Sequence, residues 1–162
     1  MNTRLVSHSR LTAMQQEQLL DIEVHPAQKD FSGDIHNALA TLLDRPNPDV
    51  HGFALLHEEV PRVFFLLKRG AFLAPWADRN AATLHALQVE RRLQRQGLGR
   101  QCLEQLPHAA RQLWPDVAQL QLSVDAENHA GLGLYLALGW VDSGEAYRGR
   151  IGYERRMSLP LR

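Results

Sequence analysis

The sequence predicts an α/β domain in which a mixed β-sheet carries helices on its faces. The chain has 162 residues, 44% of them hydrophobic and 22% charged, which suits one domain with a single core. Strand patterns alternate with helix patterns, and no repeat or low-complexity linker divides them. The run Val63–Leu67 is continuously apolar, which is typical of a strand covered on both faces. We therefore expect one domain spanning residues 1–162.

The N-terminal half predicts an edge strand, two helices and a hairpin. Thr12 is a suitable N-cap for the first helix, and Ser32 or Asp34 for the second, because short polar side chains accept hydrogen bonds from the first helical turn. The expected elements are a strand at Arg4–Val6, helices at Thr12–Asp21 and Gly33–Asp44, and hairpin strands at His51–His57 and Val60–Lys68 joined by a turn at Glu58-Glu59.

The C-terminal half alternates strands and helices. The helix at Gly97–Leu113 contains Pro107, which removes a backbone donor, so we expect a bend or break there. The expected elements are strands at Thr83–Glu90 and Gln119–Val124, helices at Gly97–Leu113 and Gly131–Leu138, a strand opening at Gly139-Trp140, and a last strand at Ile151–Leu159.

Composition excludes several classes of protein. Eighteen basic residues balance eighteen acidic ones, which argues against nucleic-acid binding through bulk positive charge. No apolar run approaches the ~20 residues that span a bilayer, and the first residues do not resemble a signal peptide. A single cysteine, Cys102, fits a reducing compartment, so we expect a cytoplasmic protein without membrane or nucleic-acid partners. The eight histidines lack metal-ligand spacing, so no metal is expected.

The stretch from Leu84 to Arg100 runs from a strand through a glycine-bearing loop directly into a helix. The first N–H groups of a helix lack partners, and the helix dipole adds partial positive charge, so a phosphate is a natural ligand at such a junction. Gly97 and Gly99 would let the backbone approach an anion closely. The alternative is a helix that simply begins with glycines. The spacing fits neither the Rossmann fingerprint nor a Walker loop.

The spacing Gln94-x-x-Gly97-x-Gly99 resembles motif A of the GNAT acetyltransferases. A second segment, Asn128 to Trp140, resembles the Asn-x-x-Ala-x-x-Leu-Tyr-x-x-x-Gly-Phe pattern of that family, with Gly131 in place of Ala and Trp140 in place of Phe. The resemblance implies a GNAT fold: a central mixed sheet of about six to seven strands with a V-shaped cleft between two splayed parallel strands, flanked by about four helices. The strand at 84–89 with residues 95–97 resembles arylalkylamine N-acetyltransferases in particular.

The resemblance also implies acetyl-CoA as cosubstrate and suggests where it binds. The pantetheine would pair with the backbone of the 83–90 strand, and the pyrophosphate would bind amides of the following loop. Asn128 would face the cofactor, and as an alternative or in addition it would cap a helix. By this resemblance the cofactor-binding residues are Leu87, Gln88, Val89, Gln94, Arg95, Gln96, Gly97, Leu98, Gly99, Arg100, Asn128 and Tyr135. The last strand could pair with a second copy, so monomer and homodimer are both expected forms.

Aminolysis of a thioester requires a base, an oxyanion donor and an acid. An alkylamine of pKa ~10.4 is mostly protonated at pH 7 and must lose a proton before it attacks. By the resemblance, Val89 N–H is the oxyanion donor and Tyr135 the acid, although Tyr135 could instead only pack and hydrogen-bond the cofactor. His85 is a candidate proton relay or a satisfied histidine in a central strand. Glu90 is a second candidate base or a solvated ion pair with the arginines that follow, and a water chain is the third alternative.

Other residues, in loops and in the helix after Gly97, have a functional and a structural interpretation. Trp76 and Asp78 could meet a cationic acceptor or pack within their loop. Phe31 could contribute to the acceptor wall. Cys102 is expected to be a small buried residue, without an acetyl-cysteine role.

We therefore expect an acetyl-CoA-dependent N-acetyltransferase that acts on a primary amine of a small molecule by direct transfer. The small-molecule acceptors considered are polyamines, arylalkylamines, amino acids and aminoglycosides, with arylalkylamines and polyamines named first, although no acidic run marks a strongly polycationic acceptor. The alternatives are a non-catalytic acyl-CoA sensor or regulatory domain, and an acetyltransferase acting on a protein amine.

Overall fold

The computed structural model describes residues 2–24, 34–93, 97–148 and 153–161, and its strands form one seven-stranded sheet of order β1-β2-β3-β4-β5-β7-β6. β4 and β5 are parallel, and the other neighbouring strands are antiparallel, so the predicted mixed sheet is confirmed. The strands are β1 Thr3–Ser7, β2 Val50–His57, β3 Val60–Lys68, β4 Ala81–Val89, β5 Gln119–Asp125, β6 Val141–Arg148 and β7 Tyr153–Pro160. The helices are α1 Ala13–Leu19, α3 Ile35–Leu43, α4 Leu98–Leu113 and α5 His129–Ala137.

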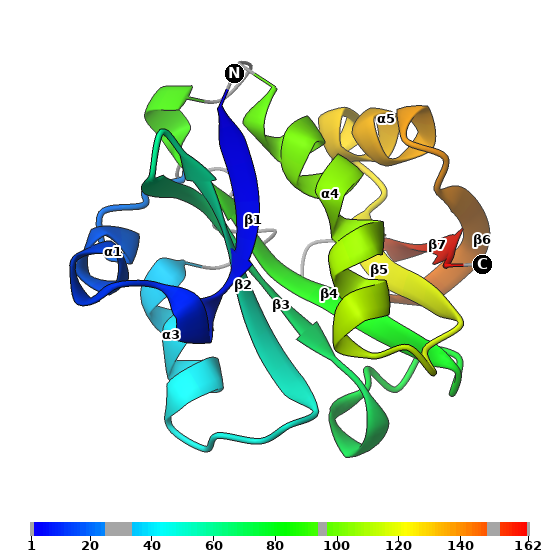
Figure 1. Ribbon diagram of the computed structural model, residues 1–162. Helices are drawn as coiled ribbons and strands as arrows, with labels where there is room; N and C mark the ends of the chain where they lie inside the picture. The colour runs from blue at the N-terminus through cyan, green and yellow to red at the C-terminus, as the bar shows by residue number, and fades with distance from the viewer. Residues whose placement is uncertain (1, 25–33, 94–96, 149–152, 162) are drawn as a thin grey trace.

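Two helix layers cover the two faces of the sheet (Figure 1). Side chains of β3 alternate between these layers because successive residues of a strand point to opposite faces. Val63, Phe65 and Leu67 pack in the core cluster that contains α4 and α5, whereas Phe64 and Leu66 pack in the cluster that contains α1 and α3. All five side chains are buried, so the prediction of a doubly covered central strand is confirmed.

Local sequence signals place most of the elements. Thr12 caps α1 in a capping box: its side chain accepts from the backbone N–H of Gln15, and the Gln15 side chain accepts from the backbone N–H of Thr12. Asp34 caps α3 through the backbone N–H of Asn37, whereas Ser32 and Gly33 lie outside the described residues. No helix in the described part of the chain is both long and apolar enough to span a membrane.

The expected break at Pro107 is not observed, and the last strand does not lie at an edge of the sheet. Pro107 lies inside α4 without ending it, because the buried residues Leu106 and Ala110 hold the helix on the sheet on both sides of the proline. The last strand, β7, lies between β5 and β6. From Glu154 to Ser158 both of its edges are paired within the chain, so these described residues offer no free edge to a second copy.

Candidate active site

The two parallel strands diverge after a short paired segment. β4 and β5 pair over three residues, the last pair being Thr83 and Gln121. Further along, β4 carries a β-bulge in which Ala86 and Leu87 lie opposite Phe65 alone, and Ala86 has a φ of 57°. A bulge bends its strand and redirects the residues that follow. The pairing of the parallel strands therefore ends at Thr83 and Gln121, and the predicted cleft would begin there.

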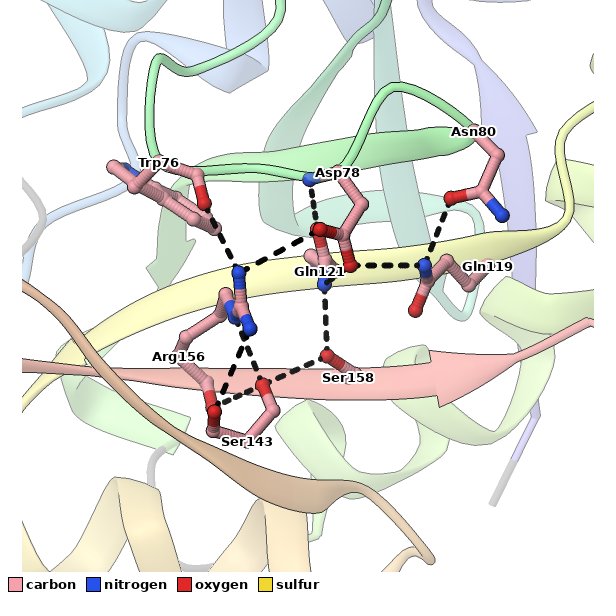
Figure 2. Close-up of polar contacts among 8 residues, drawn as sticks. All are labelled: Trp76, Asp78, Asn80, Gln119, Gln121, Ser143, Arg156 and Ser158. Carbon is pink, nitrogen blue, oxygen red and sulfur yellow. Dashed lines mark hydrogen bonds and ion pairs between the residues drawn. The ribbon is translucent and has the colours of Figure 1, made fainter.

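A buried amide closes the narrow end of this opening (Figure 2). Gln121 is only 1% exposed, and its Nε2 donates to Asp78 Oδ2 (3.0 Å) and Ser158 Oγ (2.9 Å). Its Oε1 accepts from the backbone N–H of Asp78 (2.8 Å). Gln119 adds hydrogen bonds from its Nε2 to Asp78 Oδ2 (3.3 Å) and Asn80 Oδ1 (2.8 Å). The loop before β4, the start of β5 and the end of β7 are thereby joined.

Arg156 extends the same network to β6 (Figure 2). Its Nε donates to Ser143 Oγ (3.0 Å), one terminal nitrogen donates to the carbonyl oxygen of Trp76 (3.3 Å), and that nitrogen lies 3.7 Å from Asp78 Oδ1. The Trp76 ring stacks on Tyr147 with 6.5 Å between ring centroids. Of the two hypotheses for Trp76 and Asp78, contact with a cationic acceptor or packing within their loop, the structure shows the packing contacts.

The first turn of α4 presents backbone donors without helical acceptors. Gly97 precedes the helix with a φ of +83° and provides no side-chain cap. The helical ladder starts with Gln101 N–H donating to the Gly97 carbonyl (2.9 Å), so the amides of residues 98–100 have no acceptor within the helix. No acidic side chain lies in this turn, and Arg100 adds positive charge, although it also pairs with Glu104 (3.0 Å). These residues fit a phosphate group. The predicted residues Gln94, Arg95 and Gln96 lie outside the described residues.

The end of β4, the start of α4 and the middle of α5 meet at Gly99. A Cβ placed on Gly99 would lie 3.7 Å from Val89 Cγ2 and 3.9 Å from Leu134 Cδ2. Leu98 beside it is buried in the α4 cluster and anchors the turn. The structure thus brings together Val89, Leu98, Gly99 and the helix that carries Tyr135. Leu87 and Gln88 precede Val89 on the strand beyond the bulge.

Tyr135 and Cys102 are buried together beneath this junction. The Tyr135 ring packs against Trp140 at 5.7 Å between centroids. Burial, together with the neighbouring Cys102, raises the pKa of Tyr135 to about 12, so its phenol stays protonated at neutral pH. Burial also raises the pKa of Cys102. The prediction that Cys102 is a small buried residue is confirmed.

Asn128 caps α5, the helix that carries Tyr135. Its Oδ1 accepts from the backbone N–H of Gly131 (3.1 Å). A Cβ on Gly131 would lie 2.8 Å from Asn128 Nδ2. Glycine in place of the alanine of the family pattern therefore leaves room for the capping side chain in this conformation.

His85 lies on the opposite face of the sheet from Tyr135. Its neighbours on the strand, Ala82 and Leu84, belong with Tyr135 to the α4 cluster, whereas His85 and Thr83 point the other way. His85 Nε2 lies 2.6 Å from Thr83 Oγ1. Burial and the nearby Lys68 lower the pKa of His85 to about 4, so its imidazole is neutral at pH 7. The two predicted catalytic side chains therefore lie on different faces of the sheet.

Glu90 is buried, so the expectation of a solvated ion pair is wrong. Its carboxylate, although fully buried, accepts from Arg92 Nε (3.2 Å), Arg92 N–H (3.4 Å) and Glu23 N–H (3.3 Å). Burial by itself would raise the pKa of Glu90, but these hydrogen bonds outweigh it and hold the pKa below its ordinary value. Glu90 thus joins the chain after α1 to the end of β4, and its oxygens are engaged in structural bonds.

Sequence reasoning missed a polar face formed by β5 and β7. Gln121, Ser123 and Asp125 alternate with apolar residues that face α4, and Glu154 and Arg156 lie beside them on β7. The polar and apolar alternation of the 119–124 strand was the only sign of this face. Among the described residues, no group of three or more potential metal ligands comes together.

The fold occurs in several solved acetyltransferase structures. The ribosomal-protein-S18-alanine N-acetyltransferase from Escherichia coli is 23% identical, with a TM-score of 0.65, covering 99% of this chain and 94% of its own. An acetyltransferase from Thermus thermophilus is 21% identical, with a TM-score of 0.68 and coverages of 99% and 97%. An aminoglycoside acetyltransferase solved with coenzyme A is 16% identical, with a TM-score of 0.69 and coverages of 98% and 94%.

These identities establish the fold alone, and the family assignment comes from the sequence. No curated protein matches the sequence significantly. The model of the acetyltransferase (GNAT) family matches residues 10–140. Because this match spans most of the chain and includes both motifs, the protein belongs to the acetyltransferase (GNAT) family.

Proposed function

We propose that the protein transfers an acetyl group from acetyl-CoA to a primary amine of a small molecule by direct transfer. The observation that carries this proposal is the turn before α4, where the amides of residues 98–100 lack helical acceptors directly beside the diverging strand β4. The pyrophosphate would bind there, and the pantetheine would follow Leu87, Gln88 and Val89. The resemblance of β4 to arylalkylamine N-acetyltransferases favours arylalkylamines, together with polyamines, as the first acceptors to test.

In the proposed reaction Tyr135 and His85 would each take part in a different proton transfer. The neutral amine attacks the thioester carbonyl, the C–N bond forms and the C–S bond breaks. The backbone N–H of Val89 would donate to the carbonyl oxygen as negative charge develops on it. Tyr135 would donate its proton to the departing thiolate. Burial makes this phenol a weaker acid, but it raises the pKa of a thiolate in the same site as well, as the buried Cys102 illustrates.

His85 would relay the proton that the amine loses. A neutral imidazole has one accepting and one donating nitrogen, so it can take a proton on one side and release one on the other. The lowered pKa of His85, about 4, keeps this neutral form at pH 7. Because so low a pKa makes the imidazole a weak base, we assign His85 a relay role rather than that of a lasting proton acceptor.

The proposal is tested by Tyr135→Phe, which keeps the ring against Trp140 and removes only the hydroxyl. We expect kcat to fall by about 10²-fold or more, while the dissociation constant of acetyl-CoA, measured by calorimetry, stays near that of the wild type. Tyr153→Phe, an exposed tyrosine on β7, is the matched control and should leave kcat unchanged. A fall in kcat of much less than tenfold would refute the acid role, and an absence of acetyl-CoA binding by the wild type would refute the proposed function.

A further inference from the structure

A pair of carboxyl groups spans β5 and β7 close to the proposed site. Asp125 and Glu154 are directly opposite each other in the antiparallel β5–β7 register, so their side chains lie on the same face of the sheet. Asp125 is only 3% exposed. Its Oδ1 accepts from the backbone N–H of Glu127 (2.8 Å), whereas its Oδ2 is buried and accepts no hydrogen bond from the described residues.

This pair lacks a compensating positive charge within the described part of the chain. Arg155 and Arg156, which adjoin Glu154, are paired with Asp142 and Asp78. Burial and the charge of Asp125 raise the pKa of Glu154, as does the side-chain hydrogen bond that a proton on one carboxyl group would make with the other, whereas a hydrogen bond with Ser123 lowers it. Two facing carboxyl groups with one buried oxygen left without a donor are costly unless a proton or a cation lies between them.

The position of the pair relates it to the acceptor rather than to acetyl-CoA. Asp125 points away from α4, because its neighbour Val124 belongs to the α4 cluster. It lies beyond Gln121, on the part of β5 that has separated from β4. Glu154 lies one strand further from β4, which corresponds to about 5 Å. A cation held by both groups is therefore displaced sideways from the opening where the thioester would lie.

We propose that Asp125 and Glu154 bind a second, non-reacting ammonium group of the acceptor, which makes the preferred substrate a diamine. This inference rests on the proposed function for the identity of the reaction. Short alkyl diamines fit because several bonds must separate the reacting amine from the held ammonium. With fewer than three ligands gathered here among the described residues, an ammonium suits the pair better than a divalent cation does.

Putrescine and n-butylamine test the proposal because they differ in the second amino group. We expect the wild type to prefer putrescine at least tenfold in kcat/KM, mainly through KM. Glu154→Gln and Asp125→Asn should remove this preference and leave the KM of acetyl-CoA unchanged. Asp125→Asn retains an oxygen for the Glu127 N–H, so the turn before α5 is kept. Glu145→Gln, an exposed glutamate on β6, is the matched control and should retain the preference.

A binding measurement separates this inference from the proposed function. Carbon-detected NMR of the carboxyl groups in the CoA-free protein should show the Asp125 and Glu154 signals shifting with putrescine at millimolar concentration. Failure of those signals to shift, or an equal kcat/KM for putrescine and butylamine, overturns the inference even if acetylation is observed. A shift caused by Mg²⁺ but not by putrescine overturns it in favour of a metal site. Putrescine-dependent shifts without any acetylation support the binding site and count against the proposed function alone.

Discussion

Replacing the buried Glu90 with glutamine should lower the free energy of unfolding by about 2 kcal/mol. The carboxylate accepts from the backbone N–H groups of Glu23 and Arg92 and from Arg92 Nε, at 3.2–3.4 Å. A glutamine keeps one oxygen and turns an NH₂ group towards donors, so a buried N–H loses its acceptor. Such a loss costs about 1–3 kcal/mol. We place the value near the middle of that range because all three contacts are long, and we count nothing for the exposed Arg92 guanidinium.

Urea unfolding of the wild type and Glu90→Gln measures this difference. Glu59→Gln, which breaks the exposed pair of Arg4 and Glu59 (2.7 Å), is the matched control and should leave the unfolding midpoint nearly unchanged. Since the folded-state pKa of Glu90 lies below its ordinary value of 4.5, its stabilisation is complete above that value and is lost as pH falls through the folded-state pKa. A difference below about 0.5 kcal/mol at pH 7, the range of ordinary surface substitutions, would show that the buried hydrogen bonds of Glu90 do not stabilise the fold.

Two further predictions concern the glycine before α4 and the buried histidine. Gly97→Ala should weaken acetyl-CoA binding at least tenfold in calorimetry, because alanine at a φ of +83° is strained by about 1–2 kcal/mol and relaxation would rotate the amides that follow. The matched control is Gly144→Ala, at a φ of +112° on β6, whose stability should fall similarly while its affinity for acetyl-CoA stays at the wild-type value. Equal affinities of the two variants for acetyl-CoA would contradict the proposed phosphate binding at the start of α4. For His85, the folded-state pKa of about 4 lies below the ordinary 6.5, so the wild type loses stability as pH falls through that interval. His85→Gln should lose less between pH 7 and pH 5 in urea unfolding, and an equal loss would show that the histidine is not buried as described.

The sequence predicted those features that depend on short-range patterns. The capping of α1 by Thr12, the apolar strand β3 and the glycine junction before α4 can each be recognised within about ten consecutive residues, where hydrophobic periodicity and capping chemistry act. The family motifs are of the same kind. They identify the strand, the loop and the helix that carry Val89, Gly97 and Tyr135.

The features that the sequence did not reveal depend on contacts between distant segments. Glu90 looked solvated because two arginines follow it, but its carboxylate accepts from the backbone N–H of Glu23, which is 67 residues away. The absence of an acidic run argued against a polycationic acceptor, yet β-sheet register places Asp125 opposite Glu154. Pairings of this kind depend on strand order, which a single sequence leaves open.

The buried amide of Gln121 explains why the opening between β4 and β5 begins where it does. Both N–H groups of this side chain and its oxygen are used, by Asp78 on one side and Ser158 on the other. Separating β5 from the loop that leads into β4 would break the two bonds with Asp78, which is costly for a side chain so deeply buried. The β4–β5 register ends at the pair of Thr83 and Gln121, and the bulge at Ala86 bends β4 beyond it. The paired end therefore resists separation while the bulge shapes the far end, so in the proposed site the strands would set the width available to the thioester before any ligand binds.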